Sequence, residues 1–99
     1  MMKKQVVWDE LAVLQLENQL DYIKEESVIQ AEKVRESVLD KTGELSTFYE
    51  RHPKDKYKTE NDGTYRAFEI YHYRISYRIT PNQIRIVRFR STYQNPKEY

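Results

Sequence analysis

The sequence predicts an α+β fold with its elements in the order β-α-α-β-β-β. Apolar residues recur at helical spacing between residues 9 and 49, and they alternate with polar residues at strand period between residues 64 and 92. The links between the last three strands are only two to four residues long, which is typical of an antiparallel meander. The two helices must cover one face of that meander, because their apolar stripe needs a partner. We assign residues 1–99 to one such domain.

The first strand and the first helix are predicted within residues 5–27. The apolar run QVVW (5–8) is too short for a buried helix and predicts a strand. Asp9 can cap the helix that follows, since its carboxylate can accept hydrogen bonds from free backbone N–H groups. An apolar stripe then repeats every three to four residues: Ala12, Leu16, Leu20 and Ile23. The pattern stops at the sequence EES (25–27), where we expect the helix to end.

A second helix is predicted to begin at Ser27. Ser27 and Gln30 have the spacing of a capping box, and a second apolar stripe follows them. The short link makes the two helices antiparallel neighbours. Gly43 lies within this stripe and is expected to bend or end the helix, because glycine costs about 1 kcal/mol relative to alanine in a helix. We expect helical structure to resume over residues 45–49.

Residues 51–64 form the one long polar segment and predict a loop. Pro53 and the Asp62-Gly63 pair are turn signals. Acidic residues are interleaved with the lysines of this segment, which favours a solvated loop over a basic binding loop. Three strands are then predicted over residues 64–71, 73–79 and 84–92.

The last two predicted strands carry five arginines and no acidic residue: Arg74, Arg78, Arg85, Arg88 and Arg90. Strict alternation places Arg74 and Arg78 on the face away from the apolar residues of their strand. It places Arg88 and Arg90 on the same face as Ile84 and Ile86, and it places Arg85 on the other face. Apolar residues therefore change faces halfway along residues 84–92. A β-bulge or a different cover at the two ends of the strand would each explain this change.

Charge is distributed unevenly along the chain, although the formal net charge is only +1. Residues 1–63 hold ten basic and fourteen acidic residues, a net of −4, whereas residues 64–99 hold seven and two, a net of +5. This asymmetry indicates an anionic partner or an acidic protein partner. The alternative is that the two parts neutralise each other across the fold.

Composition excludes several classes of site. The absence of cysteine excludes disulfides, cysteine-based zinc sites and thiol catalysis. His52 and His72 have no metal-ligand spacing, so we expect neither a metal nor a cofactor. No apolar run approaches the roughly 18 residues of a transmembrane helix, and no apolar segment follows the MMKK start. We therefore expect a cytoplasmic protein with no membrane partner.

Three segments of the C-terminal half carry a resemblance to a known family: YRAFEI (65–70), YRISYRI (73–79) and IRIVRFRSTYQNP (84–96). Together with the element order, they make the chain similar to the RelE/ParE superfamily of bacterial toxins. The resemblance implies a helical hairpin packed on one face of a curved, mainly antiparallel four-stranded sheet. It also implies the toxin of a type II toxin–antitoxin module, neutralised by a cognate antitoxin with which many members form heterotetramers.

Members of this superfamily divide into two mechanisms. RelE-like members cut mRNA on the ribosome without a metal, whereas ParE-like members poison DNA gyrase. For the ribonuclease reading, the resemblance implies the catalytic set Arg66, Arg74, Arg90 and Tyr93. That set is incomplete, because the position of a second active-site lysine falls on Phe68 and that of a general-acid histidine falls on Thr92.

We therefore favour the ParE-like branch, with a ribosome-dependent mRNA endonuclease and a nontoxic homologue as the alternatives. The RSTYQNP ending is also more similar to ParE-like members. For binding the target or the antitoxin, we expect Arg74, Arg78, Arg85 and Arg88 to contribute, because guanidinium groups recognise carboxylates and phosphates well.

Overall fold

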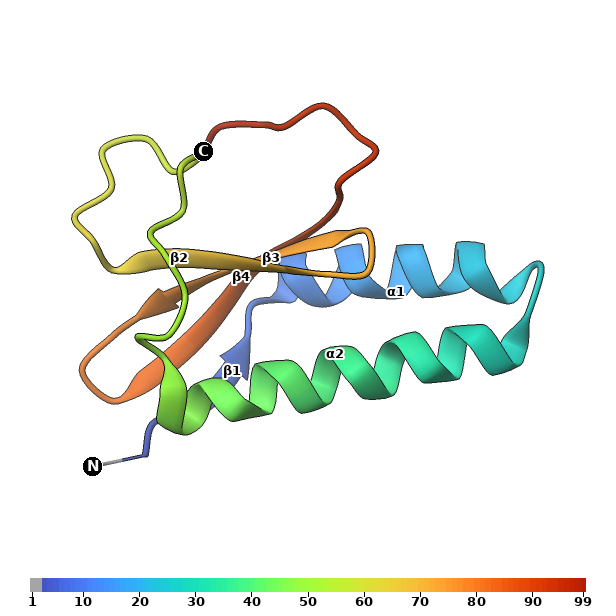
Figure 1. Cartoon of the computed structure of the whole chain (residues 1–99), viewed down its shortest axis with the longest axis horizontal. Helices are drawn as coiled ribbons and strands as arrows, with labels where there is room; N and C mark the ends of the chain where they lie inside the picture. Colours follow the sequence, from blue (N-terminus) through green and yellow to red (C-terminus); the bar gives the residue numbers. More distant parts are fainter. Residues whose placement is uncertain (1–2) are drawn as a thin grey trace.

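Two helices pack on one face of an open four-stranded mixed sheet in the computed structural model, which describes residues 3–99 (Figure 1). The expected order of elements is confirmed: β1 (Gln5–Trp8), α1 (Glu10–Lys24), α2 (Val28–Phe48), β2 (Tyr65–Ile70), β3 (Tyr73–Ile79) and β4 (Gln83–Ser91). Met1 and Met2 of the MMKK start, which was used above to predict a cytoplasmic protein, lie outside the described residues.

The strands lie in the order β1-β4-β3-β2. Short turns join β2 to β3 and β3 to β4, so these strands form the expected antiparallel meander. Along the sequence, both helices lie between β1 and the meander. In the sheet, however, β1 pairs in parallel with β4, from Gln5 opposite Gln83 to Trp8 opposite Ile86. β4 is thus an inner strand only as far as Ile86. Beyond that point α1 replaces β1, and the Gln15 side chain accepts a hydrogen bond from the Phe89 backbone N–H at 2.9 Å.

The helical hairpin forms where the caps and stripes predict it, with two corrections. Ser27 caps α2 by accepting a hydrogen bond from the Gln30 backbone N–H at 3.1 Å. Asp9 occupies the N-cap position of α1, but its carboxylate makes no capping hydrogen bond and instead accepts one from Arg85. Gly43 does not end α2, which continues to Phe48, and this glycine is on the exposed side of the helix.

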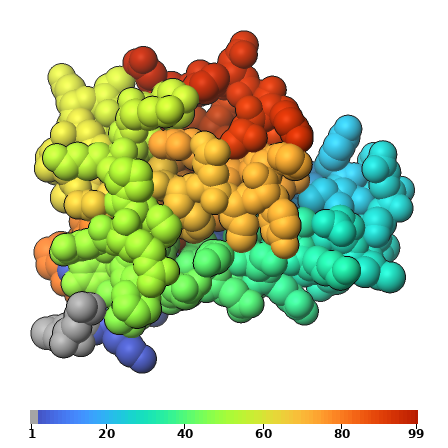
Figure 2. Space-filling view, in the orientation of Figure 1, coloured from blue at the N-terminus to red at the C-terminus, as the bar shows by residue number. Residues whose placement is uncertain are grey.

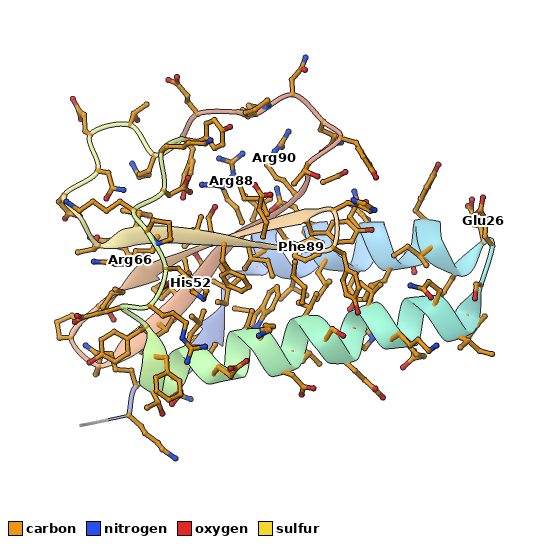
Figure 3. All side chains as sticks on the ribbon, in the orientation of Figure 1. Glu26, His52, Arg66, Arg88, Phe89 and Arg90 are labelled. Carbon is orange, nitrogen blue, oxygen red and sulfur yellow. The ribbon has the colours of Figure 1, made fainter. Side chains whose placement is uncertain are left out.

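A β-bulge in β4 corrects the predicted faces of its arginines. Tyr77 lies opposite Ile86 and Ser76 lies opposite Arg88, so Val87 is an extra residue with no partner on β3. The extra residue reverses the alternation, and Phe89 instead of Arg88 then follows Ile86 on the helix side. Figure 3 shows this reversal: Phe89 points toward the helices, whereas Arg88 and Arg90 lie on the other side of the sheet.

The core lies between the helices and the inner face of the sheet. It contains eleven buried side chains: Ala12, Leu16, Leu20, Val34, Val38, Leu45, Ile75, Tyr77, Ile84, Ile86 and Phe89. Burial of each large apolar side chain contributes about 1.5–3 kcal/mol to folding. The Tyr77 hydroxyl is satisfied because it donates a hydrogen bond to the Tyr49 carbonyl at 2.7 Å. The arginines of β3 and β4 lie on the opposite face of the sheet.

Candidate functional site

All five arginines of β3 and β4 lie on the face of the sheet away from the helices, and we call them the arginine face: Arg74, Arg78, Arg85, Arg88 and Arg90. Arg74 lies directly opposite Arg90, and Arg78 lies directly opposite Arg85. Like charges in directly opposed positions destabilise a sheet. Other groups must therefore compensate these guanidinium groups.

The two ends of the arginine face are compensated differently. At the open end, the Arg78 guanidinium lies 5.1 Å from the centre of the Tyr65 ring, and Arg85 forms an ion pair with Asp9. At the covered end, Arg74 forms ion pairs with Asp55 and Glu69, at 2.9 and 3.3 Å. Both the loop before β2 and the C-terminal segment lie over the covered end.

The C-terminal segment (residues 92–99) crosses the sheet and joins the loop before β2 (Figures 1 and 2). Its last residue, Tyr99, donates its N–H to the Tyr57 carbonyl and accepts the Thr59 N–H, both at 3.1 Å. Arg88 donates to the Lys97 carbonyl at 2.7 Å, and its guanidinium lies 4.2 Å from the centre of the Tyr99 ring. Backbone hydrogen bonds and the ring of Tyr99 therefore hold the C-terminal segment over the covered end.

Asp55 connects the loop, the sheet and the C-terminal segment. Its side chain is fully buried and accepts hydrogen bonds from the Tyr99 hydroxyl at 2.6 Å, from Arg74 at 2.9 Å and from the Tyr57 N–H at 3.1 Å. Burial raises the pKa of Asp55, but the hydrogen bonds from Tyr99, Arg74, Ser76 and Tyr57 lower it by more, so that the pKa falls below its usual value. Asp55 therefore stays ionised and holds the covered end together.

Arg66 is not brought together with Arg74 and Arg90. It lies opposite Tyr77 in β2, on the helix side of the sheet, and donates to the His52 carbonyl at 2.7 Å. Figure 3 shows Arg66 near His52 and well apart from Arg88 and Arg90. The loop also covers this edge of β2, since Asp55 donates its N–H to the Tyr65 carbonyl at 2.9 Å. Arg66 consequently fixes the loop to the edge of the sheet.

Tyr93 lies beyond the end of β4, next to the β2–β3 turn. Its side chain is 77% exposed, and its ring centre is 4.6 Å from that of His72. Of the four residues of the predicted catalytic set, only Arg74 and Arg90 are direct neighbours in the sheet. Of the predicted binding set, Arg78 and Arg85 are exposed, whereas Arg88 is buried.

Histidine acid–base chemistry finds little support on the arginine face. His52 stacks on Phe68 with ring centres 4.5 Å apart, on the helix side of the sheet. Burial, together with the nearby charges of Arg51 and Lys41, lowers the pKa of His52.

Within residues 3–99, no three potential ligands lie where they could hold a metal ion. In that same range, neither helix is long and apolar enough to cross a membrane.

Sequence reasoning missed Asp55 and Tyr99, which complete the covered end. Both residues are far in sequence from the arginines that they contact, and Asp55 looked like one of several charges in a solvated loop. The one available signal was the lack of acidic residues near five arginines, which implied a distant partner. The loop before β2 and the C-terminal segment were the remaining polar segments that could supply it.

Comparisons with known proteins agree with this geometry. A family model described as the ParE toxin of the type II toxin–antitoxin system parDE matches residues 6–96. A solved structure titled as the chromosomal ParDE system from P. aeruginosa is similar, with a TM-score of 0.71. That match covers 90% of this chain and 96% of the other at 16% sequence identity, which shows a shared fold. No curated protein sequence matches this chain.

Proposed function

Since the chain belongs to the ParE toxin family of type II toxin–antitoxin systems, we propose that it stops bacterial growth by acting on DNA gyrase in the cytoplasm. We further propose that a cognate antitoxin neutralises it. The observation that carries the choice of gyrase is the separation of the ribonuclease candidates over the two faces of the sheet. Arg66 faces the helices, while Arg74 and Arg90 face the C-terminal segment.

The state of Arg74 also supports a role in folding instead of RNA cleavage. Two carboxylates, Asp55 and Glu69, already neutralise its guanidinium. Cleavage at a ribose 2′-OH needs a general base, a general acid and a free positive charge for the developing phosphorane. Arg74 already forms an ion pair with the buried carboxylate of Asp55, so its positive charge is poorly suited to stabilise a phosphorane. A protein that acts by binding does not need these groups.

The open end of the arginine face suits recognition of an acidic protein surface. Arg78 and Arg85 are both exposed, and Arg85 keeps 44% of its side chain accessible in spite of its ion pair with Asp9. Exposed apolar side chains also occur on α1, among them Leu11 and Leu14, with 56% and 55% of their surface accessible. We propose that an antitoxin bearing acidic and apolar residues binds these surfaces, as strand or helix.

Gyrase inhibition is testable with purified proteins. Supercoiling of relaxed plasmid by gyrase should fall as the chain is added, and prior addition of the antitoxin should restore it. The antitoxin is to be sought in the adjacent open reading frame. Supercoiling that stays unchanged at high toxin excess would contradict the proposed target. If strong expression also leaves bacterial growth unaffected, the chain is a nontoxic homologue.

A ribosome-dependent mRNA endonuclease is the second candidate, favoured by the direct opposition of Arg74 and Arg90 and by the exposed ring of Tyr93. Its test is cleavage of mRNA on programmed ribosomes. This candidate requires Arg74→Ala and Tyr93→Phe both to lower the cleavage rate. Cleavage at the wild-type rate in both variants would remove it.

A further inference from the structure

A small cavity separates the covered end of the arginine face from the C-terminal segment. Its volume is about 110 Å³. Basic and hydroxyl residues line it, together with two carboxylates: Arg74, Arg88, Arg90, Thr92 and Lys97, and Asp55 and Glu69. A space of this size can hold several water molecules or one small ion with water. Sheet arginines form its floor and the C-terminal segment forms its roof.

Two of the arginines at this cavity have no carboxylate partner among the described residues. Arg88 is only 8% exposed, yet it is held by a carbonyl and by the face of Tyr99. Arg90 donates only a long hydrogen bond of 3.4 Å, to the Asn95 carbonyl. Charged residues are rarely buried without a paired opposite charge. Positive charge at this end of the sheet thus exceeds what the protein compensates.

The two nearby carboxylates already accept hydrogen bonds or form ion pairs with other groups. Asp55 accepts from Arg74, Tyr99 and Tyr57, and Glu69 pairs with Arg74. Both form ion pairs with Arg74, and neither forms one with Arg88 or Arg90. Burial and the neighbouring charge of Arg90 lower the pKa of Arg88, which is the direction expected for a guanidinium that lacks an anion.

We propose that this cavity binds a small oxyanion of the size and charge of inorganic phosphate. Arg88 and Arg90 would supply charge-assisted hydrogen bonds, and the hydroxyl of Thr92 would supply a neutral one. Lys97, in the roof, adds a positive charge from the C-terminal segment. The bound anion links the sheet to the C-terminal segment and makes this segment harder to lift.

The roof favours a free anion over a phosphate of a nucleic-acid strand. Arg88 and Lys97 are joined by a hydrogen bond across the cavity, and Tyr99 fixes the segment to Asp55 beyond it. A polymer would have to displace both contacts, whereas a free ion enters without this change. The proposal does not rest on gyrase or on an antitoxin, and its test measures binding alone.

Phosphate binding can be measured by isothermal titration calorimetry and by the midpoint of thermal unfolding, with chloride at equal ionic strength as the reference. We expect saturable binding, and an unfolding midpoint that keeps rising with phosphate concentration. Arg90→Gln should weaken binding by about tenfold or more, because it removes a charge-assisted donor. Arg78→Gln is the matched control, because Arg78 is on the same face but does not line the cavity.

Three results would overturn the proposal: an equal effect of chloride, unchanged phosphate affinity in Arg90→Gln, or an equal loss of affinity in Arg78→Gln. Binding of a short single-stranded oligonucleotide without binding of phosphate would also overturn it. Hydrogen exchange gives an independent measurement. The Tyr99 amide, which donates to the Tyr57 carbonyl, should exchange more slowly with phosphate, and unchanged exchange would contradict the proposed link.

Discussion

The open and covered ends of the arginine face share one composition but differ in their surroundings. Each end has a pair of directly opposed arginines, Arg78 with Arg85 and Arg74 with Arg90. The open pair lies beside Asp9 and Tyr65, and both of its guanidinium groups reach solvent. The covered pair lies beneath the C-terminal segment, and Arg74 of this pair forms an ion pair with the buried Asp55 of the loop before β2.

This difference shows that a row of arginines can serve two purposes within one sheet. At the covered end, the charge is part of a buried network that attaches two irregular segments to the sheet. At the open end, Arg78 and Arg85 remain exposed to a partner. Stability should therefore depend on the covered end, and recognition of partners should depend on the open end. The variants below test this division, from the largest expected effect to the smallest.

Insertion of one alanine between Arg88 and Phe89 should have the largest effect. One added residue reverses the positions after it, so that Phe89 turns toward the arginine face and Arg90 turns toward the core. Burial of an unpaired charge costs several kcal/mol, so cooperative thermal unfolding, followed by circular dichroism, should be lost. Deletion of Val87 is the control, because it removes the extra residue but leaves Arg88, Phe89 and Arg90 on their present faces, and it should unfold cooperatively. An insertion variant as stable as the wild type would mean that strand alternation does not set these faces.

The bulge also marks the limit of what the sequence could predict about the fold. Element order, the α1 stripe and the Ser27 cap follow local patterns, and all were predictable. The bulge depends on how β4 packs on its neighbours. From the sequence it was one of two explanations for the change of face, and no local pattern chose between them. Strict alternation placed Arg88 and Arg90 on the wrong face, because a single extra residue reverses every position after it.

Asp55→Asn should be the most destabilising point substitution at the covered end. The amide keeps the shape of the side chain but removes the charge, and Arg74 loses its closest ionic partner. Loss of one member of a buried ion pair costs about 3 kcal/mol, which is measurable by urea denaturation. Asp40→Asn, on the exposed side of α2, is the matched control and should change stability by less than about 0.5 kcal/mol.

The effect of Asp55→Asn should also depend on pH. Because the native pKa of Asp55 lies below its usual value, its contribution is fully present above the unfolded pKa and is lost as pH falls through the native pKa. The difference in unfolding free energy between wild type and Asp55→Asn should therefore be constant from pH 7 to about 5 and shrink below about 4. A difference that grows on acidification would contradict the assignment.

The candidate site was less predictable than the fold, for a physical reason. Its arginines are local to two strands and were visible as a pattern. Asp55 is 19 residues from Arg74 in the sequence, and Tyr99 is 11 residues from Arg88, so both contacts form only when the intervening chain folds back. No periodicity in the sequence describes such a closure. Arg66 illustrates the same limit: one step along β2 from Tyr65 places it on the opposite face, beside His52.

Tyr99→Phe should have an intermediate effect. It removes the hydroxyl that donates to Asp55 at 2.6 Å but keeps the ring against Arg88. Loss of a hydrogen bond to a charged group costs about 1.5–3 kcal/mol, so denaturation should show a smaller loss than Asp55→Asn. Faster hydrogen exchange of the Thr59 amide, which donates to the Tyr99 carbonyl, should accompany it. Tyr93→Phe is the control, since that ring is largely exposed.

Substitution of both open-end arginines, Arg78→Gln with Arg85→Gln, should have the smallest effect on stability. The Arg85–Asp9 pair is partly exposed, and such pairs contribute about 0.2–1 kcal/mol. Affinity for the antitoxin or the target should nevertheless fall by about tenfold or more, because exposed guanidinium groups are the donors that carboxylates recognise. Lys33→Gln on α2 is the control for a general change of charge. A variant that unfolds easily yet binds its partner normally would reverse the division between the two ends. The open end would then be the structural one, and the search for the partner would move to the covered end.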